Sequence, residues 1–300
     1  MTPMTGAVRP LIGLLQELAN LKRIRVAHRP GSLAQHLFAD AFRALVAGDD
    51  PKRVALVVTA RAVVLASLGG VDADVLRRAT LDEAAVHSIT ARAFDAPGLG
   101  LDPAFAAALR DVTSARLRSA AEPAFVAKLA HQPRAGATMP GKARLVLDPT
   151  ETHAEHCVLV AISGVLLASV YGAPFEDVFL AALVHHLHNA DLPDGGFAGE
   201  ERLGEHFTAV ASAFRCAALG ELSPALRARV EPFASGWPDA GTATARAFHA
   251  ADVIDRVLQQ AWHANAAGFT LAYATEEMGI VHAGPLQAFH RLVLAEAGLG

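Results

Sequence analysis

The chain has 300 residues, of which 52% are hydrophobic but only 6% aromatic, and its formal net charge is −4 with histidine neutral. A charge this small and negative gives no field that would gather nucleic acid or an anionic membrane, so we expect neither as a partner. A core poor in aromatic residues must be built from Ala, Leu and Val, and Ala and Leu are the best helix formers. The composition therefore predicts an all-α fold.

The first twenty residues predict a helix rather than a targeting signal. They lack the charged, then apolar, then small-residue pattern of a signal peptide. Their leucines instead repeat along one face of a helix that ends near Asn20. The only cysteines, Cys157 and Cys216, are too few for a disulfide framework, which favours a reducing cytoplasm.

The longest uncharged apolar run, residues 157–173, predicts a buried helix. It has 17 residues and contains Ser163, Gly164 and Gly172. This is short for a membrane-spanning helix and fits a helix surrounded by protein on all sides. We therefore expect a soluble protein.

A segment rich in Pro and Gly, residues 132–141, predicts a boundary between an N-terminal helical domain (1–135) and a second domain (142–300). The two halves share similar helix starts, Ser32-Leu-Ala-Gln-His36 and Thr152-His-Ala-Glu-His156. A second histidine follows 51 residues after the first of these and 50 residues after the other. Both an internal duplication and chance alignment of Ala-rich helices explain this. Under duplication, the first half is a metal-free structural unit, a lid or the interface of a homodimer.

Histidine is concentrated in the second half. Six of the 14 histidines lie between His153 and His206, and neutral imidazole is the commonest protein ligand for divalent transition metals. In the segment that ends one apolar helix, we expect His185 and His188 to share a side and His186 to point about 100° away. A later segment places His249, Asp252 and Asp255 along one helical face. Three helices are thus expected to present ligands inward.

These motifs resemble the HD-domain superfamily of metal-dependent phosphohydrolases over residues 145–265. Ala154-Glu155-His156 is similar to that family's first histidine motif, Ala182-Leu183-Val184-His185-His186 to its His-Asp pair, and Ala251-Asp252 to its distal aspartate. The resemblance implies an HD-like helical bundle. It also implies that the metal ligands are His156, His185, His186 and Asp252.

The chain departs from the family at His186, which stands where the family has its defining aspartate. Exchanging a carboxylate for an imidazole removes a negative charge and favours Fe, Ni, Zn or Cu over Mg. We expect one or two divalent transition-metal ions, with Fe, Mn, Ni or Zn as the candidates. In the iron-dependent oxygenase branch of the superfamily, extra histidines hold a second ion, and His206 resembles the first of these.

The loop at residues 189–199 is the segment predicted to face a substrate. Gly195 and Gly196 permit a positive φ and a close backbone approach, and Asp191 and Asp194 can hydrogen-bond a metal ligand or a substrate hydroxyl. Proton relays are expected from Asp191, Glu200 or His206. The acidic residues that begin the next helix also complement its dipole, which is the alternative explanation of Glu200.

Other polar residues are predicted to play supporting roles. We expect His153, His188 and His249 to lie on helix surfaces or to support the ligands, and Asp255 to pair near Arg256 or with solvent.

Three functions remain open from the sequence. The first is a metal-dependent hydrolase of a phosphate ester on a small molecule or nucleotide. The second is an iron-dependent oxygenase on the same scaffold. The third is a non-catalytic regulatory or scaffold protein, motivated by the altered His-Asp pair and the metal-free first half.

Overall fold

The computed structural model describes residues 7–96 and 98–299 and confirms the all-α prediction. Residues 1–6 and Pro97 lie outside the described residues. The segment predicted to be a helix rather than a signal peptide begins in residues 1–6. The described α-helices are α1 (Ile12–Ala19), α2 (Leu33–Val46), α3 (Pro51–Ser67), α4 (Ala73–Arg78), α5 (Glu83–Ala91), α6 (Pro103–Asp111), α7 (Ala124–His131), α8 (His153–Tyr171), α9 (Phe175–Val184), α10 (Gly196–Leu203), α11 (Phe207–Leu219), α12 (Pro224–Val230), α13 (Ala243–Ala267) and α14 (Gln287–Ala297).

Short elements connect these helices. The strands found in the described ranges are two, β1 (Arg25–Val26) and β2 (Arg29–Ser32), which pair antiparallel. The 3-10 and π turns are η1 (Arg9–Leu11), η2 (Asn20–Lys22), η3 (Arg92–Phe94), η4 (Leu187–Ala190), η5 (Gly204–His206) and η6 (Tyr273–Glu277).

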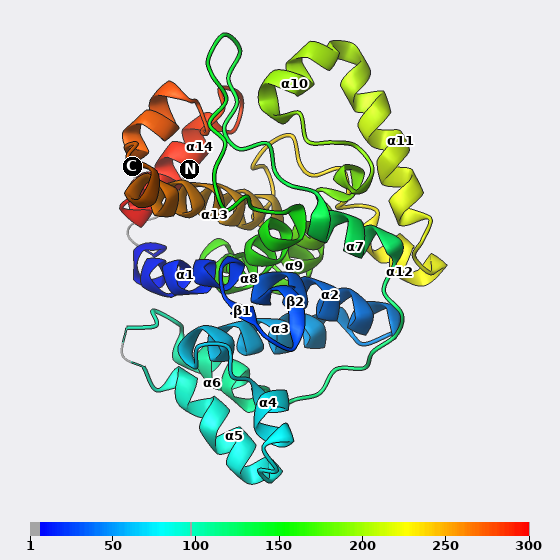
Figure 1. Ribbon diagram of the computed structural model, residues 1–300, viewed down its shortest axis with the longest axis vertical. Helices are drawn as coiled ribbons and strands as arrows, with labels where there is room; N and C mark the ends of the chain where they lie inside the picture. Colours follow the sequence, from blue (N-terminus) through cyan, green and yellow to red (C-terminus); the bar gives the residue numbers. More distant parts are fainter. Residues whose placement is uncertain (1–6, 97, 300) are drawn as a thin grey trace.

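Helix α8 forms the centre of the molecule (Figure 1). Thr152 and Glu155 form a capping box at its first turn, and Gly172 ends it in the left-handed conformation at φ 67°. The helix is long and apolar enough to cross a membrane, but 89% of its apolar window is buried inside the protein. The predicted buried helix is therefore confirmed.

Helices α9 and α13 pack against α8 and bring the predicted site segments together. A side chain at Gly164 of α8 would place its Cβ 2.5 Å from Val178 Cγ1 on α9 and 3.8 Å from Ala251 Cβ on α13. The absence of a side chain at this one position lets the three helices approach closely. Residues on α8 and α13 that are distant in sequence consequently face one another.

Residues 7–70 pack directly on this centre. Helices α2 and α3 contact α8 and α9, and buried residues from both predicted halves belong to one continuous hydrophobic core. The similar helix starts predicted before His36 and His156 are confirmed, since Ser32 and Thr152 each form a capping box. The two boxes also touch, with Ser32 Oγ donating to Glu155 Oε1 at 2.5 Å. The duplication and the division at residues 135–142 remain predictions.

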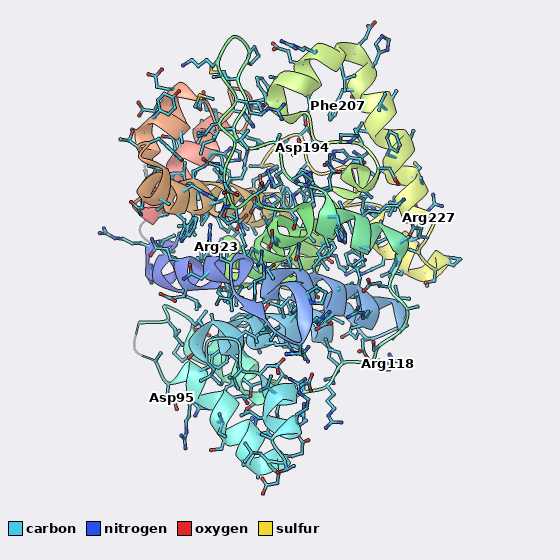
Figure 2. All side chains as sticks on the ribbon, viewed as in Figure 1. Arg23, Asp95, Arg118, Asp194, Phe207 and Arg227 are labelled. Atoms are coloured by element: carbon cyan, nitrogen blue, oxygen red, sulfur yellow. The ribbon has the colours of Figure 1, made fainter. Side chains whose placement is uncertain are left out.

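Two outer groups of helices flank the core (Figure 1). Helices α4–α6 form one end, and α10–α12 form an arm at the other side of the view. Figure 2 marks Phe207 and Arg227 on this arm and Asp194 nearer the middle of the molecule. The segment predicted as a domain boundary is not a loose linker, because its residues 134–138 line a cavity beside α13.

Candidate metal centre

His156 lies in the first turn of α8, where it is fully buried. Its Nδ1 lies 2.8 Å from Asp255 Oδ2 on α13. An ionised carboxylate only accepts hydrogen bonds, so the imidazole donates from Nδ1 to Asp255, and in its neutral form the lone pair is then on Nε2. The helix cap and the bond to Asp255 together aim that Nε2 away from α8.

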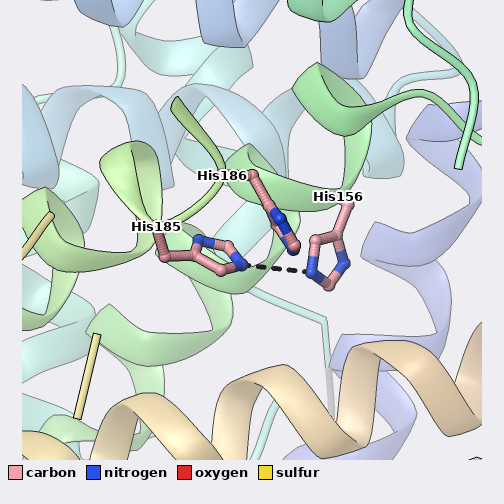
Figure 3. Close-up of side chains that lie close together, drawn as sticks. All are labelled: His156, His185 and His186. Atoms are coloured by element: carbon pink, nitrogen blue, oxygen red, sulfur yellow. Dashed lines mark hydrogen bonds between the residues drawn. The ribbon is translucent and has the colours of Figure 1, made fainter. Parts of the chain in front are cut away.

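His185 and His186 follow the end of α9, and their orientation differs from the prediction. The α-helix ends at Val184, and the chain continues at His186 with φ −110° and ψ 20° into the 3-10 turn η4. Helical spacing therefore does not hold, and His186 does not point away from His185: their ring centroids are 4.2 Å apart. Both imidazoles turn toward His156 (Figure 3).

Each of these two imidazoles also has a protein acceptor at Nδ1. His185 Nδ1 lies 2.6 Å from the Ala182 carbonyl oxygen, and His186 Nδ1 lies 2.9 Å from Asn189 Oδ1. Each ring therefore donates from Nδ1 and keeps a lone pair on Nε2. All three imidazoles thus have the hydrogen-bond acceptor at Nδ1 that orients histidines in known metal sites.

The three histidines converge on one point. One ring nitrogen from each lies within 4.8 Å of the others, and His185 Nε2 is 3.3 Å from His156 Nε2 (Figure 3). When both rings are neutral, these two nitrogens carry lone pairs that repel each other at this distance, and a cation between them would relieve the repulsion. Burial, followed by the neighbouring imidazoles, holds the pKa of His185 and His186 well below the usual value. Neutral imidazole is the form that binds a metal.

Asp252 on α13 completes the predicted set. Its Oδ1 is 3.2 Å from His156 Nε2, and its Oδ2 is 3.0 Å from Arg256 Nη2. Burial opposes its ionisation, but the positive charge of Arg256 outweighs burial and holds the pKa of Asp252 well below the usual value. The aspartate is therefore a carboxylate at neutral pH, and it lies beside His156, next to the point where the three histidines meet.

Asp255 does not pair near Arg256 or with solvent, and that prediction is wrong. It is 3% exposed and accepts from His156 and from Lys22 Nζ, the latter at 2.7 Å. Lys22 also donates to Glu151. The sequence showed no signal for this arrangement, because Lys22 lies 233 residues from Asp255 and in the other predicted half.

A cavity of about 440 Å³ opens at the centre. His185, His186 and Asp252 line it. Its other walls come from α10, α13, α14 and the loops between helices, and include Arg134, Trp237, Phe248, Arg256, Gln260 and His290. A volume of this size suits a small molecule.

Arg134 and Asp194 form a second layer beside the histidines. Asp194 Oδ2 accepts from the Ala135 backbone N–H at 2.9 Å and lies 3.4 Å from Nε2 of the buried His153. Asp194 was predicted to hydrogen-bond a metal ligand or a substrate hydroxyl. His153 was predicted to lie on a helix surface or to support the ligands. Gly196 has φ 61°, and a Cβ there would lie 2.4 Å from Thr138 Oγ1, so the predicted close backbone approach is confirmed at this glycine.

Two predicted site residues lie outside the centre. The His206 side chain is 79% exposed, with Glu205 Oε1 3.9 Å away, because η5 lies at the outer end of the arm. Asp191 is 42% exposed and pairs with Lys128 at the surface. Neither lines the cavity, so the structure does not bring these two residues to the other predicted site residues.

Glu200 does line the cavity, at an exposed position on α10. Packing at the cavity rim, and then the negative charge of Asp194, raise the pKa of Glu200 above its usual value. A carboxyl group with a raised pKa can exchange protons nearer to neutral pH than an ordinary one. The predicted role of Glu200 as a relay stays a prediction.

No family model, curated protein or solved structure matches the chain. The likeness to the HD superfamily therefore rests on the short motifs around His156, His185 and Asp252, and the site rests on the geometry of those residues.

Proposed function

We propose that this protein is a metal-dependent hydrolase that cleaves a phosphate ester of a small molecule. The observation that carries the proposal is the pair of facing Nε2 atoms of His156 and His185, 3.3 Å apart, beside His186 and the carboxylate of Asp252. Every imidazole of the set has its Nδ1 occupied by a protein acceptor. Such a set fits a transition-metal ion such as Fe, Mn, Ni or Zn.

Two arginines support an anionic substrate. Arg134 and Arg256 line the cavity, and each has a buried nitrogen, Nη1 and Nε respectively, without a hydrogen-bond partner. A buried donor left without a partner costs roughly 1–3 kcal/mol, so donors of this kind favour a ligand that satisfies them. Guanidinium groups next to a metal suit the oxygens of a phosphoryl group.

The remaining walls of the cavity support an organic part on the substrate. Trp237 and Phe248 provide apolar surface, with ring centroids 5.5 Å apart. His249, Gln260 and His290 are nearly fully buried and each has a polar atom without a partner. A mixture of apolar surface and a few polar atoms is typical of small-molecule sites.

The chain's residues have separate tasks in this hydrolysis. When bound, the ion would polarise a phosphoryl oxygen and acidify a water molecule for attack on phosphorus. Arg134 and Arg256 would hold the phosphoryl oxygens and offset their negative charge as the bond to phosphorus forms. Glu200 at the rim would take the proton released from the water and return it to the alkoxide that leaves as the ester P–O bond breaks.

The proposal is tested by metal analysis and phosphatase assay of His185→Ala and His206→Ala. We expect the wild-type protein to contain a transition metal and to hydrolyse a generic phosphate monoester such as 4-nitrophenyl phosphate. In His185→Ala both metal affinity and activity should fall by more than about 100-fold, the upper figure for loss of a residue that only supports a ligand.

The matched control is His206→Ala, which removes an exposed imidazole and should change neither quantity. Metal-free wild-type protein with full phosphatase activity would contradict the proposal. A metal-loaded protein without activity toward any phosphate ester would favour the regulatory or scaffold alternative. The oxygenase alternative is weakened because His206, its expected second-ion ligand, lies at the surface.

A further inference from the structure

Lys22 is an ammonium group buried next to the metal centre. It lies in η2, between α1 and β1, and is 4% exposed. Its Nζ donates to Glu151 and, at 2.7 Å, to Asp255 Oδ1. Burial lowers the pKa of Lys22, but Asp255 and Glu151 outweigh burial and raise it above the usual value. The lysine therefore carries its charge inside the protein.

The two oxygens of Asp255 link this lysine to a metal ligand. Oδ1 accepts from Lys22, and Oδ2 accepts from His156 Nδ1 at 2.8 Å. The carboxylate is thus fixed at both ends, and His156 can offer only Nε2 to an ion. The chain of contacts runs from the N-terminal segment through α13 to the first turn of α8.

Glu151 and Asp255 would face each other without the lysine. An oxygen of each carboxylate and a nitrogen of His156 lie within 4.8 Å of one another. Like charges at this distance in a buried place repel strongly. Without the ammonium between them, the Asp255 carboxylate would turn away, and His156 would lose the acceptor that fixes its tautomer and ring orientation.

We propose that Lys22 is a positioning residue of the metal centre: it holds Asp255 against His156 and so presents the Nε2 atom of His156 to the ion. This inference rests on the metal binding in the proposed function. It assigns to the first predicted half a part in the site, which that half was expected to lack.

The alternative role of Lys22 is purely structural, as a clamp between the N-terminal segment and the core. The matched control for that role is Glu151→Gln. It weakens a second buried ion pair of the same lysine and keeps the side-chain shape, but it leaves the link from Lys22 through Asp255 to His156 intact.

The first test compares zinc affinity in the full-length wild type, Lys22→Met and Glu151→Gln, measured by competition with a chelator. Loss of a partner that orients a metal ligand costs about 10–100-fold in affinity, and we expect this loss in Lys22→Met. Glu151→Gln should bind zinc like the wild type. A folded Lys22→Met with wild-type affinity, or an equal loss in both variants, would overturn the proposal.

The second test reads His156 directly in metal-free protein. Nitrogen NMR shifts of the imidazole should show a proton on Nδ1 in the wild type and in Glu151→Gln, and a mixture of tautomers in Lys22→Met. If Lys22→Met does not fold, Asp255→Asn breaks the same link from α13 and should give the same mixture. An unchanged tautomer in these variants refutes the role of Lys22.

The two tests separate this inference from the proposed function. Wild-type protein that binds no zinc or other transition metal defeats the hydrolase proposal. The tautomer of His156 in metal-free protein then still decides whether Lys22 orients this histidine.

Discussion

The histidines of this protein differ in what their Nδ1 atoms contact. In the three candidate ligands, His156, His185 and His186, that atom has a protein acceptor, so Nε2 is the free nitrogen. His290 on α14 is also buried but has no partner at either nitrogen. The candidate ligands are therefore distinguished from other buried histidines by the neighbour of Nδ1.

The buried His290 makes stability depend on pH. Burial, and then the positive charge of Arg256, lower the pKa of His290 from 6.5 to about 4. Between these two values the unfolded chain binds a proton that the folded chain does not, so the free energy of unfolding falls as the pH falls. A difference of this size corresponds to about 3 kcal/mol, present in full at pH 7 and lost toward pH 4.

We predict that His290→Leu reduces this acid sensitivity. Urea unfolding of metal-free protein at pH 7, 6 and 5 should give a shallower fall in the free energy of unfolding than in the wild type, by up to one proton. His206→Leu, at an exposed position, is the control and should keep the wild-type slope. An identical slope in the His290 variant would show that this imidazole is protonated in the folded protein.

At the scale of helices, the site depends on how closely α8, α9 and α13 approach. His156, the end of α9 and Asp252 meet because Gly164 leaves room for Val178. Val178 is fully buried and branched at Cβ, so it has little freedom to move aside. The packing of one glycine against one valine thus controls the spacing of the ligand-bearing helices.

We predict that Gly164→Ala destabilises the protein by about 1 kcal/mol. Overpacking costs about 1–3 kcal/mol, and the better helix propensity of Ala returns at most about 1 kcal/mol. The matched control is Gly13→Ala on α1, where a Cβ meets nothing within 4 Å and the substitution should stabilise. Chemical denaturation measures both.

A second substitution checks the cause. Combined with Val178→Ala, Gly164→Ala should cost less than the sum of the two single changes, because the new methyl group fills space that the valine leaves. Strict additivity would mean that the two side chains do not compete for the same space.

At the scale of the whole molecule, the two predicted halves share one core. Buried residues of α2, α3, α8 and α9 belong to the same cluster, and Lys22 joins the N-terminal segment to α13. Because α2 and α3 share their core with α8 and α9, neither pair of helices can unfold without exposing apolar surface of the other pair. Stability should therefore be common to the two halves.

We predict that the slowest amides of α2 and α3 exchange with the same free energy of opening as those of α8 and α9. Hydrogen exchange in the native state measures this by NMR or mass spectrometry. Two clearly different opening energies would show that residues 1–135 and 142–300 unfold as separate units.

Much of the local structure could be predicted from the sequence. The helix on residues 12–19, the buried helix α8 and the capped starts before His36 and His156 all follow from patterns within a few residues. The ligand set could be proposed from residue types and their order along the chain. The orientation of His186 could not, because the break after Val184 replaces helical spacing with a 3-10 turn.

The sequence by itself determined the helical class, the central helix and the identity of the residues that converge, since these depend on local propensity and on which side chains can bind a metal. Only the tertiary structure decided which nitrogen of each histidine faces the others, that Asp255 lies between His156 and Lys22, and that His206 and Asp191 lie away from this centre. Those outcomes depend on contacts between residues up to 233 positions apart. The spacing of residues along the sequence does not predict a contact between residues so far apart. Such a contact forms only when the shared core packs.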